Sequence, residues 1–268
     1  MSFERAYEYD AMSRRPVYRA VTQRLVDLCP LAPGARIVDV GCGSGLATAL
    51  LLDRYADVDA VIGIDPSEHE LAIARARVVH PKVRFVAGLA QDIRSLVGAV
   101  DATMLSNVMH QIPVGERGAV VAGCYASLVP GGRCALNTPF YKGGVAPGTS
   151  GFYLRWMAET QAELKRHGAC VQPPERTPVA LQQLSADEHR QLLEDAGFRE
   201  VRVVEEPFPY DADDWKTLST YSVFIEGATG LADLALGSQA LRAGVDRSFA
   251  ALGLESVPRN FVFATGVK

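Results

Sequence analysis

A glycine-rich turn is the feature of this sequence whose residue types point most directly to chemistry. Val38–Gly45 reads VDVGCGSG, an apolar run that breaks into alternating glycines, and a helix-forming stretch, Leu46–Leu52, follows directly. Gly41, Gly43 and Gly45 lack a Cβ, so they can adopt positive φ and turn peptide N–H groups toward a ligand at a helix N-terminus. This order of strand, tight turn and helix predicts a site for a nucleotide cofactor.

Two carboxylates accompany this turn. Asp39 lies two positions before Gly41, and Asp65 follows the next apolar run, Ala60–Ile64. A dinucleotide fingerprint, Gly-x-Gly-x-x-Gly, requires a third glycine where this chain has Leu46, and Asp39 would repel a pyrophosphate. A dinucleotide-dependent oxidoreductase is therefore kept only as the weaker alternative.

The same residues resemble a known family. Val38–Gly45 matches (V/L)D(V/I)G(C/T)G(S/T)G, the first motif of the class I S-adenosylmethionine-dependent methyltransferases, and the chain looks like their ubiquinone/menaquinone-biosynthesis-like small-molecule branch. The resemblance implies S-adenosylmethionine as the cofactor, whose cationic amino and sulfonium groups would suit Asp39. It also implies that Asp65 accepts hydrogen bonds from both ribose hydroxyls. Further implied cofactor contacts lie in the turn and directly after Asp65: Gly41, Cys42, Gly43 and Pro66.

The resemblance extends to the segment after the third apolar run. Phe85–Asp92 aligns with F-x-x-G-D-A-E-D, in which the residue after the glycine usually faces the adenine amino group. Leu89 replaces that aspartate in this chain. We therefore expect adenine to be recognised by the backbone of Ala90, or by Gln91 or Asp92.

A second polar segment follows the fourth apolar run. Ser106–Pro113 resembles the family's S-N-x-x-x-H-x-x-P, which implies that Asn107 contacts the methionine moiety and that His110 faces the cofactor or the substrate. Open α/β sheets bind ligands at the carboxyl ends of such strands. A histidine at this place is also often only structural, so both interpretations of His110 stay open.

Methyl transfer requires few catalytic groups. The acceptor attacks the sulfonium methyl in line, and most of the rate comes from alignment in a site closed to water, with a base needed only for hydroxyl or acidic nucleophiles. His110 and Tyr153 are the candidate catalytic residues, and Tyr9 and Arg14 are candidate cofactor contacts from an N-terminal lid. For Tyr153 the alternative is a helix face packed on the core.

Seven short apolar runs, separated by helix-forming segments and turn residues, predict an α/β fold. The runs are residues 35–40, 60–64, 83–87, 102–105, 133–137, 201–205 and 261–267. With the resemblance, this alternation predicts a Rossmann-like, seven-stranded, mostly parallel sheet with helices on both faces and an antiparallel last strand. Inserted helices, predicted over 152–167 and 234–252, would form a cap.

We expect the 268 residues to form a single domain. Residues 1–30 would form the lid and a first helix, 31–138 the cofactor-binding core, and 139–184 and 207–258 the cap for the substrate. Aromatic and apolar residues are frequent in both insertions. They predict a largely apolar pocket for a lipid-like, aromatic or polyketide-type small-molecule acceptor.

Composition excludes several other partners. Lys and Arg number 27 against 31 Asp and Glu, which gives no basic field for nucleic acid and no polybasic patch for a membrane surface. The apolar runs are too short for stable membrane insertion and the N-terminus lacks a signal-peptide core, so we expect a cytoplasmic protein. Five cysteines without a Cys-x-x-Cys pair suggest no metal.

One further class of function stays open at this point. A protein can retain the cofactor and act as a different catalyst or as a binding module on the same fold, because a fold does not fix a function. The acceptor, its reacting atom and the oligomeric state are not specified by the sequence.

Overall fold

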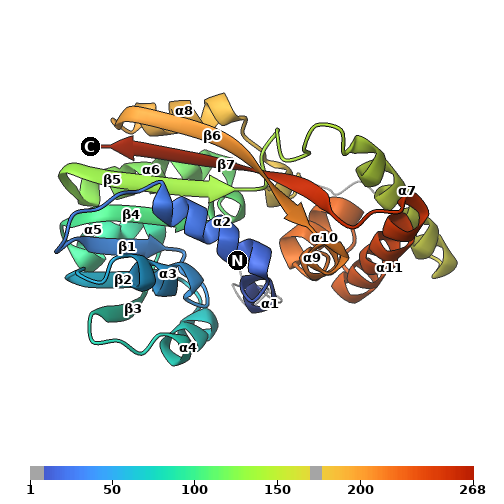
Figure 1. Ribbon diagram of the computed structural model, residues 1–268, viewed down its shortest axis with the longest axis horizontal. Coiled ribbons are helices and arrows are strands. Elements are labelled where there is room, and N and C mark those ends of the chain that lie inside the picture. The colour runs from blue at the N-terminus through green and yellow to red at the C-terminus, as the bar shows by residue number, and fades with distance from the viewer. Residues whose placement is uncertain (1–8, 170–176) are drawn as a thin grey trace.

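A computed structural model of the chain describes residues 9–169 and 177–268, and its centre is one seven-stranded sheet (Figure 1). The strand order is β3-β2-β1-β4-β5-β7-β6. Only β7 runs antiparallel to its neighbours, so the predicted Rossmann-like sheet with an antiparallel last strand is confirmed. The strands are β1 (Arg36–Val40), β2 (Ala60–Asp65), β3 (Val83–Ala87), β4 (Val100–Ser106), β5 (Leu128–Thr138), β6 (Arg199–Tyr210) and β7 (Val257–Val267).

Helices cover both faces of the sheet because successive strand residues point to opposite sides. In β1, Ile37 joins one apolar core and Val38 joins the other. The first core contains residues of α2 (Pro16–Asp27) and α3 (Leu46–Arg54). The second contains residues of α5 (Ile93–Val97), α6 (Val114–Ser127) and α8 (Ala186–Asp195). The remaining short helices are α1 (Tyr9–Ser13), α4 (Glu68–Arg77), η2 (Ala90–Asp92), η3 (Met109–Gln111) and η4 (Val179–Leu181).

Strands β6 and β7 continue past the sheet into a cluster of helices (Figure 1). Strand β5 pairs with β7 only as far as Thr138 and Val262, whereas β6 follows β7 to the pair Tyr210 and Val257. The predicted strands, residues 201–205 and 261–267, are both shorter than the observed ones. Pro207 and Pro209, which the prediction places in the insertion 207–258, fit in β6 because it is an edge strand and edge positions tolerate a missing N–H.

The cap that these strands carry consists of α7 (Ser150–Arg166), α9 (Ala212–Leu218), α10 (Ser222–Thr229) and α11 (Leu234–Leu252). The helices predicted over 152–167 and 234–252 are therefore confirmed. Residues 1–8 of the expected lid and 170–176 of the first insertion lie outside the described residues. Within the described ranges, no helix is long and apolar enough to cross a membrane.

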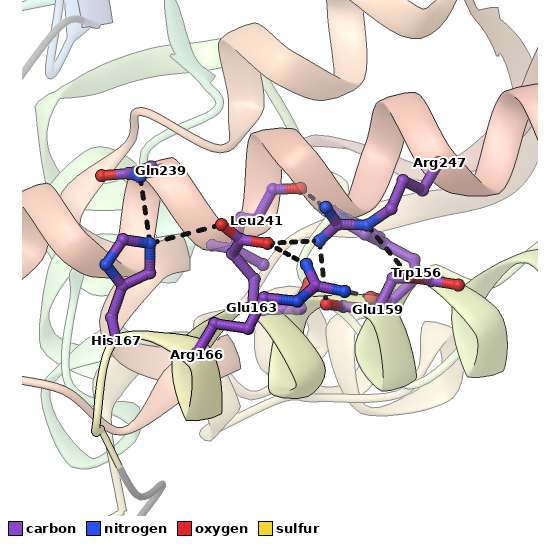
Figure 2. A network of polar contacts seen from close by, with 9 residues as sticks. Trp156, Glu159, Glu163, Arg166, His167, Gln239, Leu241 and Arg247 are labelled. Carbon is purple, nitrogen blue, oxygen red and sulfur yellow. Dashed lines mark hydrogen bonds and ion pairs between the residues drawn. The ribbon is translucent and has the colours of Figure 1, made fainter.

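A polar network joins α7 to α11 (Figure 2). Arg247 donates to Glu159 Oε2 at 3.0 Å and to Glu163 Oε2 at 2.9 Å, and the Trp156 indole N–H donates to the Leu241 carbonyl at 2.8 Å. The two helices approach closely at Gly244, where a Cβ would lie 2.6 Å from Thr160 Oγ1. These contacts hold α7 against α11.

Candidate functional site

The glycine turn adopts the conformation expected from its composition. Gly41, Gly43 and Gly45 have φ values of 67°, 48° and 84°. The Gly41 N–H donates to the Ile64 carbonyl at 2.7 Å, and a Cβ on Gly41 would lie 2.4 Å from Val108 Cγ2. The backbone of the turn thus passes close to the ends of β2 and β4. A residue larger than glycine at position 41 would clash with Val108 there.

Asp65 binds the turn at the end of β2. Its Oδ2 accepts the Gly43 N–H at 2.9 Å, and its Oδ1 accepts the Ser67 N–H at 2.9 Å. Burial raises the pKa of the carboxyl, while the two backbone hydrogen bonds oppose that shift. The following Pro66 is exposed, and Cys42 is buried in the turn.

Asp39 is completely buried beneath the turn. Its Oδ2 accepts the Thr48 hydroxyl at 2.7 Å, and its Oδ1 has no hydrogen-bond partner among the described residues. Burial raises the pKa of Asp39 to about 6. A buried carboxylate with an unused oxygen favours a ligand that brings a cation or a hydrogen-bond donor.

Two further buried acceptors follow β4 and β2, the two strands on either side of β1. Asn107, with φ of 56°, donates its N–H to Asn137 Oδ1 at 2.9 Å, but its own Oδ1 has no partner in the described chain. Glu70 on α4 is also buried, and its Oε2 is likewise unpaired among those residues. Glu70 lies at the capping position that begins α4, and nothing in a capping pattern indicates that its carboxylate is buried.

The segment expected to contact adenine lies beside Asp65. The Gly88 N–H donates to the Asp65 carbonyl at 3.2 Å, which brings the ends of β2 and β3 together. Ala90 is half-buried, and Gln91 and Asp92 are exposed on η2. The structure thus places this segment next to the glycine turn.

Helix α1 covers the turn. The Ser13 hydroxyl lies 3.3 Å from Ser44 Oγ, and Arg77 Nη1 contacts both hydroxyls at 3.2 and 2.9 Å. Arg77 also pairs with the carboxylate of Asp10. No motif singled out Arg77, although it connects the N-terminal helix to the turn from α4.

Two residues of the N-terminal lid, Tyr9 and Arg14, are predicted to bind the cofactor. Tyr9 begins α1. Arg14 follows α1, its side chain is 73% exposed, and it forms an ion pair with Asp10 at 2.6 Å. The structure does not bring the Arg14 side chain to the glycine turn.

His110 is buried at the junction between the sheet edge and the cap. Its Nδ1 lies 3.1 Å from Thr138 Oγ1, its Nε2 lies 3.2 Å from Tyr221 Oη, and its ring stacks on Phe140 at 4.3 Å. Burial, and then the positive charge of Arg259, lower the pKa of His110 to about 3. The imidazole is therefore neutral at physiological pH and both of its nitrogens are engaged.

A cavity of about 190 Å³ opens on the cap side of this junction. Tyr153 lines it and packs edge-on against Trp215, with ring centroids 5.4 Å apart. Burial raises the pKa of the Tyr153 hydroxyl. His110 and Tyr153 therefore both lie near Phe140, which stacks on His110 and lines the cavity with Tyr153. The structure shows no hydrogen bond between His110 and Tyr153. The main aromatic and cationic lining residues are Phe140, Tyr141, Tyr153, Trp215, Phe224 and Arg259.

Comparison with known proteins agrees with this geometry. Residues 37–132 match the sequence model of a family described as "Methyltransferase domain". The chain is 32% identical over 106 residues to an uncharacterized methyltransferase from Synechocystis sp., covering 40% of this chain and 48% of that protein. It is 34% identical over 117 residues to the trans-aconitate 2-methyltransferase of Variovorax paradoxus, covering 44% of this chain and 43% of that protein.

Residues 37–132 thus resemble a class I S-adenosylmethionine-dependent methyltransferase domain. A solved Bacillus halodurans protein, provisionally named a methyltransferase, has the same fold with a TM-score of 0.58 at 15% identity, covering 93% of this chain and 99% of that one. The match to the methyltransferase family ends within β5, so the cap lies outside it. The chain spans less than half the length of the curated methyltransferases described above.

Proposed function

We propose that this protein transfers a methyl group from S-adenosylmethionine to a small molecule held in the cap cavity. The observation that carries the proposal is the combination of a positive-φ glycine turn, held by Asp65, with buried unpaired acceptors on Asp39 and Asn107. Acceptor oxygens suit a cofactor that presents an ammonium and hydroxyl groups, whereas a pyrophosphate would be repelled.

The residues present fit such a cofactor at the carboxyl edge of β1, β2 and β4. We assign Asp65 to the ribose hydroxyls, Asp39 and Asn107 to the amino-acid group, and residues 88–92 to adenine. Gly41, Cys42 and Gly43 form the floor of this site, and Pro66 its rim. A cofactor bound there would supply an electrophilic methyl group to the acceptor and would leave as S-adenosylhomocysteine.

The chain's own contribution is alignment and exclusion of water. Residues 31–138 form the cofactor site, and the insertions after β5 and β6 form the acceptor cavity. His110 acts as a positioning residue, because its neutral ring fixes Thr138, Tyr221 and Phe140 where the cofactor site meets the acceptor cavity. Tyr153 lines the cavity and contacts the acceptor there.

The cavity favours an acceptor of about one ring. Phe140, Tyr153, Trp215 and Phe224 supply aromatic walls, and a volume of about 190 Å³ slightly exceeds that of an engineered cavity of roughly 150 Å³ that holds benzene. We therefore propose a compact, partly apolar or aromatic metabolite. Because one relative is named for trans-aconitate, that acid belongs among the compounds to be tested.

The test is methyl transfer from cofactor labelled in the methyl group to a panel of small metabolites that includes trans-aconitate. Label in an acceptor, together with S-adenosylhomocysteine formation, is the expected result. Asp65→Ala should abolish transfer at low cofactor concentration. Cofactor binding without transfer to any compound would favour a different catalyst or a binding protein on this fold.

A further inference from the structure

One buried cation beside the cap cavity, Arg259, has no anionic partner among the described residues. Arg259 lies on β7 with 5% of its surface exposed, in the same alternating row as Phe261 and Phe263. Side chains two positions apart share a face of a strand, so Arg259 continues a row that is otherwise aromatic at these positions. An apolar side chain would be the usual occupant of such a place.

The contacts of Arg259 leave its charge unpaired. Its Nη1 has no hydrogen-bond partner, and the described chain contains no ion pair to its guanidinium. The guanidinium instead lies 4.6 Å from the Phe140 ring centre, with Trp215 and Phe224 at 5.9 and 6.0 Å. Contacts with aromatic faces offset part of the cost of burying a cation, but they leave Nη1 without a hydrogen-bond acceptor.

A second unpaired donor lines the same cavity. Trp215 is fully buried, and its indole N–H has no partner among residues 9–169 and 177–268. Buried polar groups without partners are rare, and two such donors on residues that line one cavity point to a missing acceptor. This is the opposite of the glycine turn, where the unpaired groups are acceptors.

We propose that the cavity binds a carboxylate, and that the methyl acceptor is therefore a small, partly apolar or aromatic carboxylic acid held by Arg259. This inference rests on the proposed function, because it names the acceptor class for the same site. The flat guanidinium can donate two parallel hydrogen bonds to a carboxylate, and the Trp215 N–H can add a third. The aromatic walls then enclose the rest of the molecule.

The charge balance of the cavity favours a single negative charge. Within the described chain, Lys142 is the other cationic residue that lines the cavity. Its Nζ is already paired with Glu188 Oε2 at 2.7 Å, and it is exposed. Arg259 is thus the cation left to pair with a ligand. Its single positive charge matches one carboxylate better than a doubly charged phosphate.

Benzoate and benzamide test this directly, because they share size and shape and differ in charge. Each is titrated into the full chain in the presence of S-adenosylhomocysteine, with calorimetry and tryptophan fluorescence as readouts. Benzoate should bind at least about tenfold more tightly than benzamide, since a hydrogen bond to a charged group is worth more than a neutral one. Equal affinities would overturn the proposal.

Variants assign the preference to one side chain. Arg259→Met should remove the preference for benzoate, Arg259→Lys should keep part of it, and Lys142→Met should leave it unchanged. A preference that survives in a folded Arg259→Met protein contradicts the assignment. If Arg259→Met does not fold, Arg259→Lys provides the test. The assignment to Arg259 is then contradicted if Arg259→Lys keeps the full preference for benzoate over benzamide, or loses it completely.

The cofactor titration separates this inference from the proposed function. S-adenosylhomocysteine affinity should stay within about twofold of wild type in folded Arg259→Met, and a large loss would assign Arg259 to the cofactor and overturn the inference. Failure of the wild-type chain to bind S-adenosylhomocysteine, with the benzoate preference intact, would instead refute the proposed function and leave only the carboxylate site at Arg259.

Discussion

Gly41→Ala tests whether the glycine turn is shaped for a ligand. The substitution puts a Cβ at φ 67°, which costs about 1–2 kcal/mol for a residue other than glycine. The same Cβ would lie 2.4 Å from Val108 Cγ2, so one of the two must move by about 1 Å, and overpacking of this kind costs about 1–3 kcal/mol. We expect the free energy of unfolding to fall by about 2–5 kcal/mol in total.

Gly253→Ala is the matched control. Gly253 ends α11 with φ 62°, and no atom lies within 4 Å of the added Cβ, so this variant carries the backbone cost of about 1–2 kcal/mol alone. Urea unfolding gives both stabilities, and calorimetry gives S-adenosylhomocysteine affinity. Gly41→Ala should weaken binding by about tenfold or more, because shifts of about 1 Å can cost that much in a positioned site, and Gly253→Ala should not. Equal binding by Gly41→Ala and wild type would refute the reasoning.

Three other predictions concern charge. Affinity for S-adenosylhomocysteine should be constant above about pH 7 and fall as the pH drops through 6, because Asp39 has a pKa of about 6 and loses its charge there. Calorimetry of Asp39→Asn should show no such fall. Nitrogen NMR should find His110 neutral down to pH 5, because its pKa in the folded protein is about 3. The free energy of unfolding should fall as the pH drops below about 6.5, because His110 takes up a proton there in the unfolded chain but not in the folded one. Arg247→Met should lower the free energy of unfolding by about 1 kcal/mol in urea, because it breaks the pairs with Glu159 and Glu163, and it should not change cofactor affinity. Arg19→Met, which removes an exposed pair with Asp53, should lower it by less.

The sheet and the turn were predictable because their signals are local. The apolar run of β1, the alternating glycines and the start of α3 are contiguous, so their order along the chain already describes the site. The extension of β6 was not predictable in this way, because Pro207 and Pro209 break strands except at an edge. Only the complete strand order shows that β6 is an edge.

The contacts that close and complete the site depend on residues far apart in sequence. Arg77 reaches Ser13 and Asp10 across more than sixty positions. Arg259 looks like an ordinary strand arginine until the fold places it against Phe140 and without a carboxylate. Spacing along the chain carries no information about such pairs, so neither could be assigned before the fold was known.

Calorimetry of the full chain with S-adenosylhomocysteine and with NAD tests whether the glycine turn and Asp65 hold an S-adenosylmethionine-type cofactor. We expect one site for S-adenosylhomocysteine, a marked loss of its affinity in Asp65→Ala, and no binding of NAD. Binding of NAD in preference to S-adenosylhomocysteine, or an affinity that Asp65→Ala leaves unchanged, would contradict that assignment.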